Sequence, residues 1–232
     1  ETPDTVSTVP SPSSAAEDVI RLQNVSFRFA DADEDTLHNI SFHCRRGQTT
    51  AVVGSTGCGK STIAKLILRF HDVTSGRILL DGTDIRELPQ HELRNRISYV
   101  PQKSWLFSGT IAENLKHGCS DADEEQMQKI LACSQADFVN SLPGGLSYRA
   151  SQGGTNFSGG QRQRLSIARA LMKPAELYIF DDSFSALDFK TDAALRKALQ
   201  KETKDSAVLI IAQRISTIMH ADQTIVLENG KI

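Results

Sequence analysis

Residues 49–70 read TTAVVGSTGCGKSTIAKLILRF, a short apolar run that leads into a glycine-rich loop and then into apolar residues at helical spacing. The apolar run predicts a buried strand, and the last part predicts a helix. Between them, GSTGCGKST (54–62) matches the phosphate-binding loop pattern in the strand–helix context that the pattern requires. Its glycines permit backbone conformations that turn several N–H groups towards phosphates at the start of a helix. The stretch therefore predicts a nucleotide-binding α/β fold.

The polar side chains of this loop have separate expected roles. Lys60 carries a mobile ammonium for the terminal phosphates, and Ser61 offers a hydroxyl to Mg²⁺. Cys58 lies among the same groups near a helix start, where its thiol is expected to be reactive without a catalytic role. The candidate nucleotide-binding residues of the loop are Gly54, Ser55, Thr56, Gly57, Cys58, Gly59, Lys60, Ser61 and Thr62.

Two adjacent aspartates end another apolar run, LYIFDD (177–182). A carboxylate at the end of a buried strand can hold Mg²⁺ through water, so Asp181 is the expected second half of the metal site. A helix N-cap or a structural ion pair is the alternative interpretation of Asp181. The phosphate loop elsewhere in the chain favours the metal role.

Strand and helix patterns alternate along the rest of the chain. Residues 20–29 and 37–42 have an interrupted period of two, which is typical of half-buried antiparallel strands. Four continuous apolar runs are typical of parallel strands covered on both faces; they span 49–54, 97–100, 177–180 and 207–212. Helical spacing recurs at 159–172, and residues 110–142 contain helical stretches with no good strand. Parallel strands linked by helices predict the α/β class.

Composition excludes several other classes of protein. The chain has 232 residues, of which 39% are hydrophobic and 23% charged, as in soluble globular proteins. A net charge of -2 gives no electrostatic support for nucleic-acid binding. The four cysteines are scattered, which favours reduced thiols in a cytosolic compartment over disulfides or a zinc site. There is no apolar run of the roughly 18 residues that a membrane helix needs, and no signal peptide.

A third motif narrows the family. The segment NFSGGQRQR (156–164) resembles the signature sequence of ABC transporter nucleotide-binding domains. VPQ with Gln102, SALD (185–188) and WLFSGTIAENL (105–115) resemble further motifs of ABC exporters. The resemblance runs from about residue 18 to the end of the chain. It implies a P-loop NTPase core with a parallel sheet, an antiparallel β subdomain and an α-helical subdomain inserted at roughly 103–170.

The same resemblance implies roles for individual residues. ATP and Mg²⁺ are the implied ligands, with Gln102 joining Ser61 and Asp181 at the metal. Phe29 stands where the family stacks an aromatic ring on adenine, although it could instead belong to the core. The signature residues are expected to meet the γ-phosphate held by a second subunit; they are Ser158, Gly159, Gly160 and Gln161.

Two positions depart from the family pattern. Asp182 stands where active members carry Glu as the base for the attacking water. The Asp side chain is shorter by roughly 1.5 Å, and a misplacement on the order of 1 Å can lower the reaction rate about a hundredfold. Gln213 stands where the family has a His that contacts the γ-phosphate, and it cannot carry an imidazolium charge. With Lys60, these two are the candidate catalytic residues. A third departure is Ser151-Gln152, where exporters show Gly-Glu ahead of the signature.

These departures predict the degenerate subunit of a heterodimeric ABC exporter. Its partners would be a second nucleotide-binding domain and transmembrane domains, at the cytoplasmic face of the membrane. Residues 1–17, rich in Pro, Ser and Thr, predict a disordered linker from a preceding membrane domain, followed by the nucleotide-binding domain at 18–232. The segment TIVLENGKI (224–232) predicts a strand and a turn with no closing helix, so the chain is expected to be cut from a longer polypeptide.

Three alternatives remain on the sequence alone. A homodimeric exporter with a weak but working Asp182 is the nearest of them. A DNA-handling ABC protein would insert long coiled coils between the phosphate loop and the signature, but Ser158 follows Lys60 by only 98 positions without heptads. A regulatory module with no turnover has no chemical reason to keep a complete signature.

Overall fold

The computed structural model describes residues 18–213 and 218–232 and has a central parallel sheet with different neighbours on its two faces. The sheet has five strands in the order β11-β3-β10-β9-β6, and every neighbouring pair is parallel. The strands are β3 (Thr49–Gly54), β6 (Ile97–Val100), β9 (Leu177–Asp181), β10 (Ala207–Ala212) and β11 (Gln223–Leu227). The four apolar runs predicted as parallel strands are therefore confirmed. The predicted linker 1–17 lies outside the described residues.

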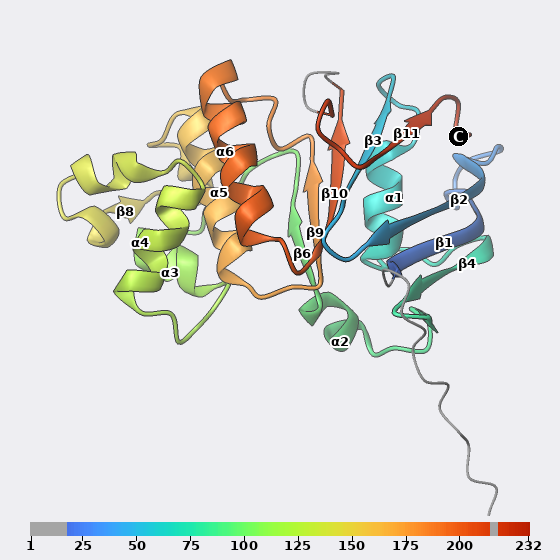
Figure 1. Ribbon diagram of the computed structural model, residues 1–232, viewed down its shortest axis with the longest axis horizontal. Helices are drawn as coiled ribbons and strands as arrows, with labels where there is room; N and C mark the ends of the chain where they lie inside the picture. The colour runs from blue at the N-terminus through green and yellow to red at the C-terminus, as the bar shows by residue number, and fades with distance from the viewer. Residues whose placement is uncertain (1–17, 214–217) are drawn as a thin grey trace, which may run out of the picture.

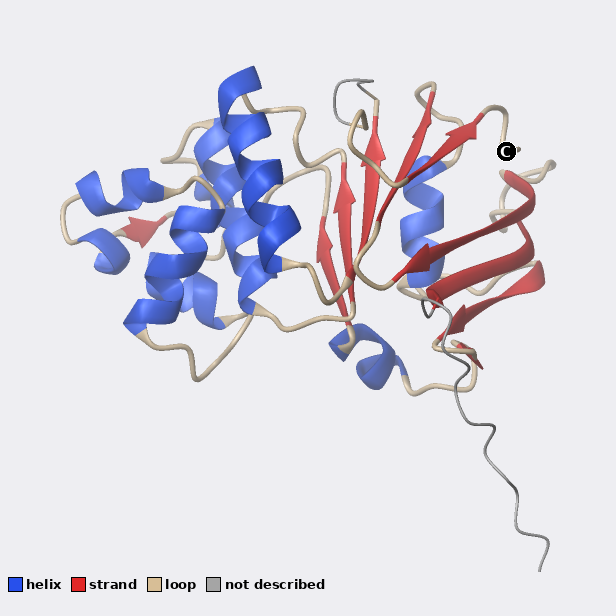
Figure 2. Cartoon of the chain, in the orientation of Figure 1, coloured by secondary structure: helices blue, strands red, loops and turns tan. Residues whose placement is uncertain are grey.

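A second sheet is antiparallel and packs beyond helix α1 (Figures 1 and 2). Its order is β2-β1-β4-β5, with β1 (Asp18–Phe27), β2 (Leu37–Arg45), β4 (Ser75–Leu80) and β5 (Thr83–Asp84). The interruption in the period of β1 is a register shift between Leu22 and Val25, next to Asn24 with a φ of 51°. The predicted antiparallel strands are confirmed, and Phe29 lies two residues past the end of β1.

Helices flank the parallel sheet on both sides (Figure 1). Helix α1 lies between the two sheets, whereas α3, α4, α5 and α6 gather beyond the opposite face of the parallel sheet. The helices are α1 (Lys60–Ile67), α2 (Gln90–Asn95), α3 (Ile111–Lys116), α4 (Glu124–Cys133), α5 (Gly159–Met172) and α6 (Phe189–Glu202), with short 3-10 turns at Asp137–Ser141, Gly145–Ser147 and Gln152–Gly154. The two-residue strands β7 (Gly109–Thr110) and β8 (Arg149–Ala150) pair within the helical region. The predicted helix at 159–172 is confirmed at both ends.

The parallel strands supply side chains to two separate cores. On β10, Leu209 and Ile211 face the core shared with α1 and the antiparallel sheet, whereas Val208 and Ile210 face the core shared with the long helices. Both faces of the strand are buried, which explains why its sequence is apolar without alternation. The longest helices, α5 and α6, have 14 residues each, so the helical region contains no long coiled-coil arm among the described residues.

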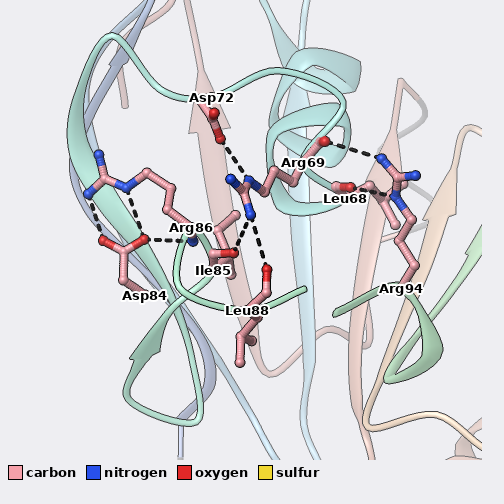
Figure 3. Close-up of polar contacts among 8 residues, drawn as sticks. All are labelled: Leu68, Arg69, Asp72, Asp84, Ile85, Arg86, Leu88 and Arg94. Atoms are coloured by element: carbon pink, nitrogen blue, oxygen red, sulfur yellow. Dashed lines mark hydrogen bonds and ion pairs between the residues drawn. The ribbon is translucent and has the colours of Figure 1, made fainter. Parts of the chain in front are cut away.

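Arginine side chains fix the end of α1 (Figure 3). The helix ends at Ile67, three residues earlier than its apolar pattern predicts, because Arg69 turns to a φ of 53°. Arg94 of α2 donates to the carbonyl oxygens of Leu68 and Arg69 at 3.1 and 3.2 Å, satisfying carbonyls that a helix end leaves free. Arg69 in turn donates to Ile85 O and Leu88 O at 3.2 and 3.1 Å.

The end of α5 is tied to the same place. The ammonium of Lys173, the residue after α5, donates to Arg94 O and, at 2.9 Å, to Ile97 O. The hydroxyl of Ser98 donates to Ala170 O at 2.8 Å, adding a second bond between β6 and the last turn of α5. The C-terminal ends of α1 and α5 are therefore both bonded to the short segment that contains α2 and the start of β6.

Candidate functional site

The phosphate loop connects the end of β3 to the start of α1. Gly57 and Gly59 have φ values of 83° and 104°, a region that residues with a Cβ rarely adopt. A Cβ on Gly59 would also lie 2.7 Å from Leu37 Cδ2. These glycines allow the loop to wrap tightly at the positive end of α1, which is the arrangement that binds phosphate groups.

The ammonium of Lys60 lies inside this loop. It donates to Gly54 O at 2.9 Å and to Ser55 O at 2.6 Å, and the residue is only 7% exposed. These two carbonyls hold the positive charge in the loop, at the place where the terminal phosphates of a nucleotide would be bound. The structure therefore places the Lys60 ammonium beside the backbone of the glycine-rich loop, as the sequence predicts.

The carboxylate of Asp181 ends β9 beside the phosphate loop. It accepts a hydrogen bond from Ser61 Oγ at 2.9 Å and another from the Tyr99 hydroxyl at 3.1 Å. Burial raises the pKa of Asp181, the two hydroxyl donors lower it, and the neighbouring Asp182 charge raises it. The same burial, with the Asp181 charge next to it, raises the pKa of Tyr99, so its phenol stays protonated and donates.

Asp182 follows the last residue of β9, at the same edge of the sheet as Asp181, and its backbone leaves the strand direction. Its φ is 46°, a left-handed conformation that Asp tolerates better than most residues, and its N–H donates to Ile211 O at 2.8 Å. Gln102 Nε2 donates to Asp182 Oδ2 at 3.1 Å. The carboxylate is thus held by the side chain that the sequence had suggested for the metal.

A cavity of about 300 Å³ joins these residues into one site. Its lining contains residues from the phosphate loop, from the ends of β9 and β10, and from the loop after β1. The lining residues are Phe29, Thr36, Thr56, Gly57, Gly59, Lys60, Ser61, Thr62, Gln102, Asp181, Asp182, Ile211 and Gln213. The cavity lies at the carboxyl ends of the parallel strands, where ligands bind in open α/β sheets.

Phe29 lies at the rim of the cavity and is half-buried. Its ring meets Phe27 edge to face with centroids 4.7 Å apart, and it meets His71 edge to face at 5.5 Å. The two interpretations of this residue are therefore compatible, because one side of the ring packs on the core and the residue also lines the cavity.

Three predicted loop residues do not line the cavity. Three residues that were not predicted do belong to the site, two in the cavity lining and one through its bond to Asp181. Gly54, Ser55 and Cys58 are absent from the lining. Gly54 is confined by the sheet, since a Cβ there would lie 2.1 Å from Leu227 O on β11. Sequence reasoning missed Thr36, Tyr99 and Ile211. Only Tyr99 had a usable signal, a phenol inside a strand with apolar residues at both ends.

The structure places Cys58 in the core, and this burial disfavours the reactive thiol that the sequence led us to expect. The residue is 6% exposed and belongs to the core shared with α1. Its sulfur faces Lys60 Nζ at 3.7 Å from inside the loop. The sequence led us to expect the Cys58 side chain among the phosphate-binding backbone groups, but it packs into the core on the other side of the loop.

Native-state labelling is therefore expected to spare Cys58. Brief maleimide treatment should modify the partly exposed Cys119 and Cys133 first, while the buried Cys44 and Cys58 react only as the protein unfolds. Peptide mass spectrometry after a short pulse, with a urea-unfolded sample as the control, measures the order. Full labelling of Cys58 within the pulse would contradict the burial.

The signature residues lie apart from this cavity, at the start of α5. Ser158 accepts from Gln161 N at 3.2 Å, and Gln161 Oε1 accepts from Ser158 N at 3.0 Å, a reciprocal N-cap. Ser158 and Gly159 are exposed, and Gly160 is half-buried. Just ahead, Ser151 Oγ donates to Asn156 Oδ1 at 2.9 Å, so Ser151 takes part in the turn that leads to the signature.

A second cavity, of about 600 Å³, lies between α6 and β10. None of the predicted site residues line it, and its walls are mainly apolar. The cavity of about 300 Å³ is lined by the phosphate loop, both aspartates and Gln213, so we assign the candidate site to that cavity.

Comparison with known proteins agrees with this geometry. The sequence profile described as "ABC transporter" matches residues 37–185. An uncharacterized ABC transporter ATP-binding protein of Mycobacterium tuberculosis is 47% identical over 225 residues, which cover 95% of this chain and 38% of that protein. A Bacillus subtilis protein provisionally named as a multidrug export ATP-binding/permease protein is 45% identical over 214 residues, 92% of this chain and 37% of that protein.

A solved structure is also similar. A bacterial Atm1-family ABC exporter with ATP bound has a TM-score of 0.88 and 35% identity, covering 99% of this chain and 40% of that one. The chain thus spans well under half the length of these relatives. Among residues 18–213 and 218–232, no helix combines the length and the apolar character needed to cross a membrane.

Proposed function

The chain belongs to the ABC transporter family as an ATP-binding domain of the exporter type, and on this premise we propose that it binds Mg-ATP at a site that is degenerate for hydrolysis. The single observation that carries the proposal is the joint presence of Asp182 and Gln213 in the cavity that contains Lys60 and Asp181. The residues suited to holding the nucleotide are complete, whereas those suited to activating water are weakened.

The site residues fit ATP and Mg²⁺ chemically. The positive φ values of Gly57 and Gly59 let the loop curve into a phosphate cradle, and Lys60 supplies a positive charge within it. Ser61 and Asp181 present oxygen donors, which Mg²⁺ prefers. The metal, when bound, would neutralise charge on the terminal phosphates. Phe29 at the rim would contact the base, and Gln102 would join the site from the side of Asp182.

The degenerate character follows from reach and charge. Asp182 carries one methylene less than the Glu that the family uses, and its carboxylate is engaged by Gln102 at 3.1 Å. A general base must come within hydrogen-bond distance of its water, so the shorter, engaged carboxylate is a poor base. Gln213 offers an amide where a charged imidazole would stabilise developing negative charge.

We further propose that a second ATP-binding domain completes both sites. Ser158 and its neighbours are exposed at an N-cap away from the chain's own cavity, which suits contact with a nucleotide held by another subunit. In a heterodimer, this chain's signature would serve the partner's active site, and this chain's cavity would be the slow one. The assembly would include transmembrane domains and work at the cytoplasmic face of a membrane, with 18–232 as the nucleotide-binding domain and roughly 103–170 as its helical subdomain.

The direct test is nucleotide binding measured alongside turnover. The purified protein is expected to bind Mg-ATP, with release of phosphate far below the ~10 s⁻¹ typical of enzymes, because the base is displaced. A fluorescent ATP analogue reports binding, and a coupled phosphate assay reports turnover. Lys60→Ala is the control that should lose binding. Turnover near 10 s⁻¹ for the unmodified protein would refute the degenerate site.

A homodimeric exporter with a working Asp182 is the second candidate. The observation in its favour is that the Asp182 carboxylate still lines the cavity beside Asp181. In that case Asp182→Ala would abolish turnover by the purified protein without any partner chain.

A further inference from the structure

The metal-side carboxylate is held from two directions. Asp181 is 3% exposed, so water cannot readily satisfy its oxygens. Ser61 of α1 donates to Oδ1 at 2.9 Å, and Tyr99 of β6 donates to Oδ2 at 3.1 Å. Ser61 belongs to the phosphate loop, but Tyr99 belongs to none of the motifs that identify the family. Its contact with Asp181 is therefore a feature that the motifs leave unexplained.

We propose that Tyr99 is a positioning residue for Mg²⁺ binding, which fixes the Asp181 carboxylate so that Oδ1 faces Ser61 and the phosphate loop. This inference rests on the proposed binding of Mg-ATP. Tyr99 acts through Asp181 and has no direct contact with nucleotide or metal in the proposal.

Geometry favours the phenol for this task. β6 and β9 are adjacent parallel strands, with Tyr99 paired to Ile179, so the ring is anchored on the sheet two residues before Asp181. A carboxylate turns easily about its last bond, and one donor on one oxygen leaves that rotation open. Donors on both oxygens, one from α1 and one from β6, define the plane of the group. Such outer partners orient the groups that hold a metal.

Burial gives Tyr99 a second reason to matter. Asp181 is 3% exposed, and without the Tyr99 hydroxyl its Oδ2 would lose the hydrogen bond that it accepts at 3.1 Å. The plane of the carboxylate would then be set by the Ser61 bond alone.

The test compares two tyrosines. Tyr99→Phe removes the hydroxyl bond to Asp181. Tyr178→Phe removes a similar bond, from its hydroxyl to Lys173 O at 2.9 Å, on a residue that is 7% exposed and faces the other core. The readout is the Mg²⁺ concentration that gives half-maximal binding of a fluorescent ATP analogue to the full-length protein. We expect about a tenfold increase for Tyr99→Phe and no change for Tyr178→Phe.

Two further measurements separate positioning from folding. Thermal melting is expected to fall by similar amounts in both variants, because each loses one partly buried hydrogen bond. In an Asp181→Asn background, Tyr99→Phe is expected to add no further change in Mg²⁺ dependence, because its target is already altered.

The outcomes distinguish the inference from the function beneath it. If the unmodified protein requires Mg²⁺ for tight binding but Tyr99→Phe leaves that requirement unchanged, Tyr99 is structural and the inference is wrong. An equal shift in both tyrosine variants would overturn it as well. If the unmodified protein binds the analogue with no dependence on Mg²⁺, the proposed Mg-ATP site itself fails.

Discussion

Asp182→Glu combined with Gln213→His is expected to raise ATP hydrolysis by about a hundredfold over the unmodified protein. The longer carboxylate regains roughly 1.5 Å of reach, and misplacement on the order of 1 Å can cost about a hundredfold. The imidazole restores a charged contact to the γ-phosphate. Each single change is expected to give less, because base and phosphate contact act on one transition state and need not be additive. Steady-state phosphate release by the purified chain measures the effect.

Concentration dependence and a matched variant sharpen this test. The gain is expected to grow more than linearly with protein concentration, since in the proposed assembly each site is completed by the signature of a second chain. Asp182→Gln with Gln213→His has the same side-chain length without a base, and it is expected to stay at the original rate. A double variant that binds ATP but hydrolyses it no faster would show that these two positions do not limit the site.

Ser158→Ala is expected to depress hydrolysis by about a hundredfold in an assembled heterodimeric transporter, the range seen when one donor to a developing charge is removed. ATP should remain bound at this chain's own phosphate loop, because Ser158 lies outside that cavity. Turnover of the assembly and occupancy of each site by a photoreactive ATP analogue are the two measurements.

Loss of the helix cap must be separated from loss of the phosphate contact. Ser158→Ala removes an N-cap worth about 1 kcal/mol. Asp123→Ala removes the same kind of reciprocal cap on α4, so it serves as the control and should leave turnover intact. If Ser158→Ala left turnover unchanged while Asp182→Ala abolished it, the asymmetry would be the reverse of the one proposed.

Local patterns predicted much of the fold. The apolar runs of β3, β6, β9 and β10 and the helix at 159–172 were readable because burial on both strand faces and helical spacing leave direct marks in sequence. The end of α1 was not readable, since it depends on Arg69 taking a positive φ and on capping by the distant Arg94. Such contacts between segments leave no local periodicity.

The site was predictable to a similar degree. The motifs indicated Lys60, Ser61 and Asp181, and the structure brings all three to one cavity with Asp182 and Gln213. The directions of individual side chains could not be predicted from the motifs. Cys58 turned into the core because the loop leaves space beneath it, and Tyr99 reached Asp181 only because β6 happens to neighbour β9. The Tyr99 contact depends on strand order, which no single motif contains.

The bonds from Lys173 and Arg94 have a mechanical consequence. The helix after the phosphate loop and the helix after the signature are both bonded at their C-terminal ends to the short segment around α2. The phosphate loop and the signature therefore each lie at the N-terminal end of a helix whose C-terminal end is bonded to the same segment. With 14 residues and a rise of about 1.5 Å each, α5 is about 21 Å long. A change in the packing of the segment around α2 would therefore act on both loops, and on Ser158 across the full length of α5.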